Sequence, residues 1–158
     1  MITQTERGQS IVELAISLTV ILFLLAGAVE FGIAFFQFIQ LRDAAQEGAL
    51  YGSICPVESK IIDRVRNASN SPVDLSVTSG PEAVGVTVTW YNGTSVNPAD
   101  QISSADIEAG DGVKVEVTYN HRIFMPFISA FIGSNTIPLR ASVTDTILDT
   151  NTSKPICQ

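Results

Sequence analysis

The pattern of apolar and polar positions separates a membrane-type segment near the N-terminus from a smaller part with mixed patterning. Across residues 14–39 the only charged residue is Glu30. About 20 helical residues cross the ~30 Å hydrocarbon core of a bilayer. A buried helix of a soluble protein is a poor alternative, because residues 14–29 offer no polar face. The pattern therefore predicts one transmembrane helix over about residues 14–36.

The predicted helix continues beyond the membrane. Polar and apolar residues then alternate at helical spacing, and the next proline is Pro56. A continuous helix over about residues 10–54 would be roughly 65 Å long at 1.5 Å per residue. Its second half is amphipathic. We therefore expect residues 1–8 as a short flank, residues 9–54 as the long helix, and residues 55–158 as a separate head.

The head has the patterning of an α+β domain. Apolar residues recur at helical spacing over residues 57–68, and period-two alternation marks strands at 84–90, 113–119 and about 139–148, with residues 73–79 as a further candidate strand. We expect a small antiparallel sheet packed against the amphipathic half of the long helix. The apolar stretch 124–133 predicts a short helix from Pro126 to a Gly133 cap, either in the core or as a surface patch for a partner or the membrane.

Charge constrains the partners and the orientation. The net charge is −7, and no basic cluster that would favour nucleic acid is present. Arg7 lies before the apolar segment, which favours a cytoplasmic N-terminus and a head on the other side of the membrane. A rival interpretation is a secretory signal peptide cleaved after Ala28, which would release the head.

The two cysteines, Cys55 and Cys157, both follow the apolar segment and would share one side of the membrane. Neither has metal-type spacing. In an oxidising compartment they could form one disulfide that joins the end of the long helix to the end of the chain. Two free thiols are the alternative.

The sequence offers few candidates for catalytic residues. His121 is the only histidine, and no Ser or Cys motif accompanies it, so we expect a surface or strand-edge residue and no enzyme activity. Asp106, Glu108 and Asp111 read as a polar turn, with a calcium site as the less favoured option. No cofactor or metal is expected.

Two glutamates are costly where they stand. Glu13 lies at the start of the apolar run and Glu30 lies near its end. An ionised side chain inside hydrocarbon costs about 2.5–3.5 kcal/mol on the mildest scale. Glu30 either extends to the outer interface or contacts another subunit. Ala28 and Gly32 form a small-xxx-small pair through which another helix could approach closely.

Three sequence elements resemble those of TadE-like proteins, the minor pilins or pseudopilins of tight-adherence type IV pili. They are Arg-Gly-Gln-Ser-Ile-Val-Glu-Leu at residues 7–14, Val-Glu-Phe-Gly at 29–32, and the alanine-rich stretch at 41–52. The resemblance implies a pilin-like fold, cleavage by a prepilin peptidase between Gly8 and Gln9, and a mature chain whose fifth residue is Glu13. That carboxylate would pair with the new α-amino group of a neighbouring subunit.

The same resemblance implies the partners. They would be the prepilin peptidase, other pilins and the pilus assembly platform, with the chain as a subunit of a homo- or hetero-oligomeric filament or as an assembly factor at the inner membrane. Two alternatives from other classes stay open: a membrane-tethered binding or adhesion module that never enters a filament, and the secreted domain described above.

Overall fold

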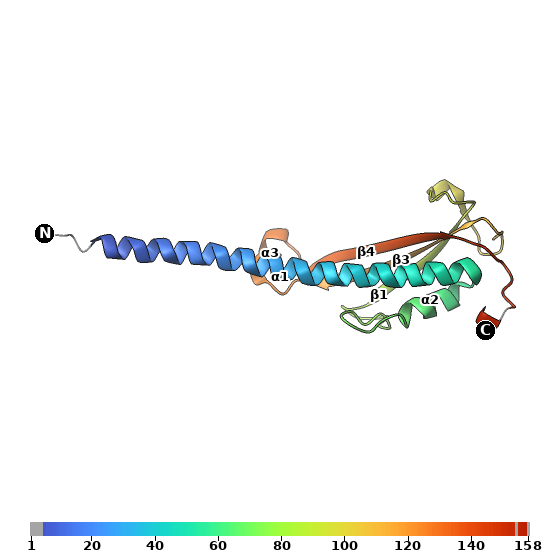
Figure 1. The fold of residues 1–158 in the computed structure, drawn as a ribbon, viewed down its shortest axis with the longest axis horizontal. Coiled ribbons are helices and arrows are strands. Elements are labelled where there is room, and N and C mark those ends of the chain that lie inside the picture. The colour runs from blue at the N-terminus through green and yellow to red at the C-terminus, as the bar shows by residue number, and fades with distance from the viewer. Residues whose placement is uncertain (1–4, 154, 158) are drawn as a thin grey trace.

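The structure is a computed structural model that describes residues 5–153 and 155–157. One long helix carries a compact head on its C-terminal half, and its N-terminal half projects alone (Figure 1). The elements in chain order are α1 (Thr5–Ile54), α2 (Glu58–Arg66), β1 (Val84–Tyr91), η1 (Pro98–Asp100), β2 (Gln101–Ile102), β3 (Gly112–Arg122), α3 (Pro126–Ile132), β4 (Thr136–Thr146) and η2 (Pro155–Cys157). The expected α+β class, with a long helix on a small antiparallel sheet, is confirmed.

Helix α1 is continuous, as the absence of proline predicted, and it ends at Ile54, before Cys55 and Pro56. Its two halves have different surroundings. Residues 8–25 are all exposed, whereas Glu30 is the first buried residue and buried positions recur from there at helical spacing. The head therefore covers α1 only from Glu30 onward.

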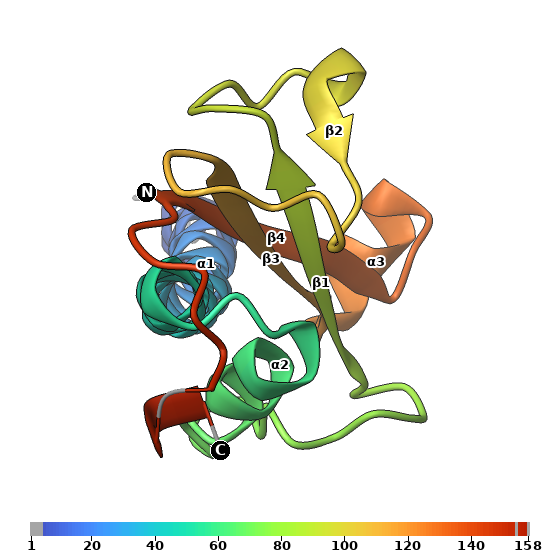
Figure 2. The ribbon, with the colours of Figure 1, turned by 90° about the vertical axis from the view of Figure 1, so that its right-hand side faces the viewer.

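The head contains a four-stranded antiparallel sheet in the order β2-β1-β3-β4. Strand β3 is central: it pairs with β1 from Gly112↔Tyr91 to Tyr119↔Val84, and with β4 over its whole length. Helices α1 and α2 lie on one side of this sheet (Figure 2). The other side is polar, where Glu116 on β3 forms ion pairs with Lys114 and with Arg140 on β4.

Two glycines let α1 approach its neighbours closely. An added Cβ at Gly48 would lie 2.5 Å from Cγ2 of Val65 on α2, and one at Gly52 would lie 2.9 Å from Cδ1 of Ile61. A side chain at either position would force the facing side chains or the helices to shift. The alanine-rich part of α1 is thus the contact surface of the head, together with the buried valines of β3.

The predicted strand at 73–79 is wrong. The backbone of Val73 is held by the side-chain amide of Gln40 on α1, which donates to its carbonyl at 2.7 Å and accepts from its N–H at 2.9 Å. Next, the Asp74 carboxylate accepts from the Ser76 hydroxyl and N–H, which bends the chain and lowers the pKa of Asp74. Side-chain hydrogen bonds therefore replace the ladder that a strand would need.

The segment between β1 and β3 is a loop with one two-residue strand. Strand β2 pairs Ile102 with Trp90, so this polar segment contributes only a short edge. Asp111 ties the loop together, because one carboxylate oxygen accepts from Gly93 N–H and the other from Glu108 N–H. Both oxygens of Asp111 thus bond to backbone groups, as in a polar turn, and no group of three potential ligands that could hold a metal occurs among the described residues.

A disulfide joins Cys55, directly after α1, to Cys157, with the two Cα atoms 5.7 Å apart. The cross-link spans 102 positions in the sequence. In the chain-entropy model, closing a loop of about 100 residues stabilises the folded state by about 4.7 kcal/mol. The C-terminal segment is therefore fastened to the end of α1 that lies farthest from the projecting half (Figure 1).

The predicted helix at 126–133 is confirmed as α3, with Pro126 in its first turn and Gly133 as a left-handed cap at φ 71°. The side chains of Phe124, two residues before α3, and of Ile132, its last residue, are 68% and 54% exposed. The side chains of Pro126, Phe127 and Phe131 lie outside the described part of the structure.

Candidate functional site

The N-terminal signature lies on the projecting half of α1. Gly8, Gln9 and Glu13 all belong to the helix and are exposed. An added Cβ at Gly8 would meet nothing within 4 Å. The head contributes nothing to this region, so a processing enzyme would meet the Gly8–Gln9 bond free of tertiary contacts.

Glu13 stands one helical turn after Gln9. No hydrogen bond or ion pair joins its carboxylate to another described residue. Its neighbours along the helix, Ile11, Val12 and Leu14, are each more than half exposed. Glu13 is thus a carboxylate on an apolar surface, and its own chain supplies no counter-charge among the residues described.

The small residues Ala28 and Gly32 are also exposed, and nothing lies within 4 Å of an added Cβ at Gly32. The head therefore leaves this part of the helix surface open. The helix contact predicted for the pair stays a prediction. Close approach within the chain instead uses Gly48 and Gly52, which sequence analysis did not single out.

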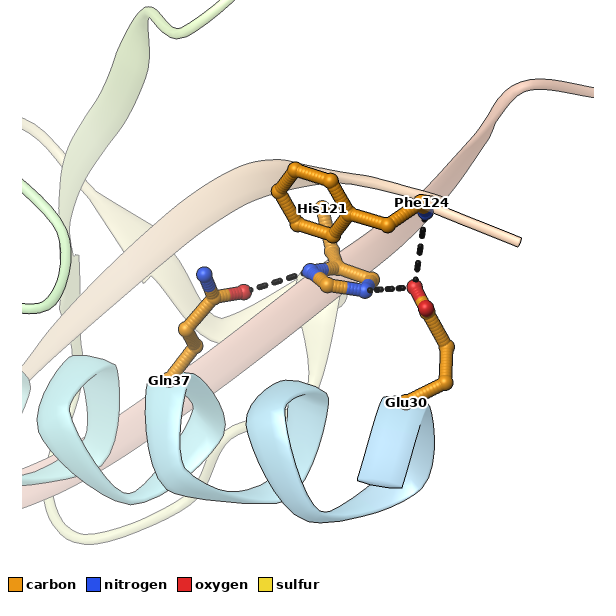
Figure 3. Close-up of polar contacts among 4 residues, drawn as sticks. All are labelled: Glu30, Gln37, His121 and Phe124. Atoms are coloured by element: carbon orange, nitrogen blue, oxygen red, sulfur yellow. Dashed lines mark hydrogen bonds and ion pairs between the residues drawn. The ribbon is translucent and has the colours of Figure 1, made fainter. Parts of the chain in front are cut away.

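Glu30 is the centre of a buried polar cluster between α1 and the end of β3 (Figure 3). One carboxylate oxygen of Glu30 lies 2.9 Å from His121 Nε2 and accepts from the Phe124 N–H at 3.1 Å. The other ring nitrogen of His121, Nδ1, lies 2.7 Å from the side-chain oxygen of Gln37. Glu30, Gln37 and His121 are 6%, 8% and 1% exposed. Three polar side chains are therefore satisfied together in a buried contact.

The cluster constrains the proton positions on the ring. With the Gln37 amide oriented as in Figure 3, both ring nitrogens face oxygen acceptors, which a doubly protonated ring satisfies by donating from both. With that amide rotated, its NH₂ group would donate to Nδ1 of a neutral ring. In both arrangements Nε2–H donates to Glu30. With Nε2 protonated, the carboxylate receives two hydrogen bonds, from His121 and from Phe124.

The structure corrects the expectation for His121, which is buried and not a surface or edge residue. Strand β3 continues to Arg122 instead of ending at Tyr119, so His121 stays on the face that carries Val115 and Val117 and turns toward α1. The signal was present in the sequence, because extending the period-two alternation past residue 119 places His121 on the apolar face.

Glu30 is likewise not a side chain that extends to the outer interface, since it is buried against its own head. The contact with His121 accounts for its burial without a second subunit. Glu30 and Gln37 are seven positions apart, two helical turns, and so share one face of α1. That spacing is visible in sequence. Their shared partner, His121, lies 91 positions from Glu30, and the sequence alone does not reveal this contact.

Comparison with known proteins gives one match. Residues 8–50 match the family described as TadE-like protein. Residues 8–50 are TadE-like. No curated protein and no solved structure matches the chain significantly. The TadE-like match supports a protein associated with the Tad pilus.

The TadE-like segment contains Gly8, Glu13, Glu30 and Gln37, whereas His121 comes from the head beyond it. The helix side of the buried cluster therefore falls within the family match. Among the described residues, α1 is also the one helix long and apolar enough to cross a membrane by length and composition. The family match and the candidate membrane span therefore lie on the same helix.

Proposed function

We propose that the chain is a TadE-like minor pilin or pseudopilin, a structural subunit or assembly factor of a tight-adherence type IV pilus with no enzymatic role. Helix α1 anchors it in the inner membrane with the N-terminus in the cytoplasm and the head outside. A prepilin peptidase removes residues 1–8. Other pilins and the assembly platform then engage the projecting half of α1.

The contrast between the two glutamates of α1 carries this proposal. Glu30 has a partner in its own head, but Glu13 has none among the described residues and stands on an exposed apolar surface. A lone charge in hydrocarbon is costly, and a pair of opposite charges is tolerated. Cleavage after Gly8 would create a positive α-amino group at Gln9. On a neighbouring subunit, that group is a suitable partner for Glu13.

The mass of the mature protein purified from its native membrane tests the processing step. We expect a chain that starts at Gln9. A chain that starts at Met1 would favour a tethered module that never enters a filament. A chain that starts at Val29 would indicate a secreted domain and would rule out the anchored pilin.

The assembly role of Glu13 is tested by Glu13→Gln, which removes the charge and keeps the size. We expect normal insertion and head folding but loss of the chain from sheared filaments and from crosslinked pilin complexes. Glu58→Gln is the matched control, because Glu58 is an exposed carboxylate on the head. If Glu13→Gln assembled as well as Glu58→Gln, Glu13 would not be the residue that recognises a neighbour.

A further inference from the structure

The end of the head nearest the projecting half of α1 has an apolar surface. Residues 123–139 contain no charged side chain, and Arg122 and Arg140 bound them. Within this stretch Phe124, two residues before α3, and Ile132, the last residue of α3, are mostly exposed. Contiguous exposed apolar surface marks contacts with proteins or membranes.

The buried cluster fixes where this end lies along α1. The Phe124 N–H donates to Glu30, so Phe124 is level with Glu30, and α3 begins two residues later. Figure 1 shows α3 at the level where the head begins, and Figure 2 shows it set to the side of the α1 axis. The surface is therefore a second contact area beside the helix.

The length of the membrane span determines how deep Glu30 and Phe124 would lie in the bilayer. A span of about 20 residues that begins at Leu14 ends near residue 34. Glu30 lies about four residues before that end, which is about 6 Å at 1.5 Å per residue. Amphipathic segments that lie in the membrane interface sink by about 5–10 Å. Phe124 and Ile132 would thus meet the boundary between headgroups and acyl chains.

We propose that Phe124 and α3 form an interfacial membrane contact that sits in the outer leaflet beside the span of α1. The occupant of this surface is lipid and not a second copy of the chain. The inference rests on the anchoring proposed above. It also gives the buried cluster a purpose, because His121 and Phe124 shield Glu30 at a depth where an unpaired carboxylate would be costly.

Tryptophan quenching by brominated lipids tests the contact in the full chain, with one copy per nanodisc so that no second copy is present. Phe124→Trp is the test variant. Leu148→Trp is the matched control, since Leu148 is 70% exposed and bonds to Ser53 at the far end of α1. Leu22→Trp reports on the span itself. Native Trp90 is 5% exposed and provides a constant background.

We expect emission from Phe124→Trp to shift to the blue and to be quenched most by bromines near the headgroup end of the acyl chains. Leu22→Trp should be quenched most by deeper bromines. The Trp of Leu148→Trp should not be quenched by any of the brominated lipids. If Phe124→Trp behaved like Leu148→Trp while Leu22→Trp was quenched, the contact would be refuted with the anchor intact. An unquenched Leu22→Trp would refute the anchor and the contact together. If Phe124→Trp misfolds, Ile132→Trp repeats the measurement at a residue that takes no part in the bond to Glu30.

Discussion

Replacing His121 by alanine tests whether the buried cluster holds the head on α1. The change leaves the Glu30 carboxylate buried with only the Phe124 N–H as a donor, and it leaves Gln37 without its partner. Leaving a buried polar group without its hydrogen-bond partner typically costs about 1–3 kcal/mol. We expect His121→Ala to lower the free energy of unfolding by that amount, measured by urea titration of the full chain in detergent. Trp90, the only tryptophan, reports the transition from within the core.

Glu30→Gln, alone and combined with His121→Ala, separates the effect of losing the Glu30–His121 contact from the effect of the cavity that the missing ring leaves. Glu30→Gln keeps an oxygen for the Phe124 N–H and removes the charge, so it should cost only about 1–2 kcal/mol. The double variant should be less destabilised than the sum of the two single variants, because the partners touch. Asn120→Ala, at an exposed position on the same strand, is the control. A loss below about 0.5 kcal/mol for His121→Ala, the range of ordinary surface changes, would show that the cluster does not hold the head.

The remaining predictions concern packing and a turn. Gly48→Val should lower the free energy of unfolding by about 1–3 kcal/mol in the same urea titration, because its Cβ would press on Val65, whereas Gly27→Ala, with nothing within 4 Å, should not destabilise. Ser76→Ala should raise the pKa of Asp74 toward its ordinary value of 3.8, followed by NMR titration, since Ser76 is the main cause of the lowering. The sign follows from linkage: a lowered folded pKa stabilises above the ordinary value, and this contribution disappears as the pH falls through the lowered pKa. An unchanged Asp74 titration would show that the turn does not depend on the Ser76 hydroxyl.

Local pattern was enough to predict most of the fold. The end of α1 at Ile54, helix α2, and the strands β1, β3 and β4 all follow from periodicity and from the positions of proline and glycine. These signals suffice because each reports on burial of one face within a few residues. Strand boundaries were less accurate, and β3 runs to Arg122, three residues beyond the predicted end at Tyr119.

The errors arose where side chains from distant segments decide the structure. Residues 73–79 have the composition of a strand, but Gln40 on α1 captures the backbone of Val73 across 33 positions. For His121 the alternation of β3 was sufficient to predict burial, and only its partner, 91 positions away, could not be predicted. Periodicity contains no information about which segments meet. The sequence therefore identified Glu13 and Glu30 as costly and left their partners open.

The place where the head begins on α1 gives the two glutamates different roles. A charge on a membrane helix needs either water or a partner, and a partner must come from the same chain or from another one. From Glu30 onward the head lies against α1 and supplies His121 and the Phe124 N–H. At Glu13, 17 positions earlier and about 25 Å along the helix, the head is out of reach. In the proposed assembly the partner of Glu13 is the α-amino group of a neighbouring subunit, whereas Glu30 already has a partner in its own head.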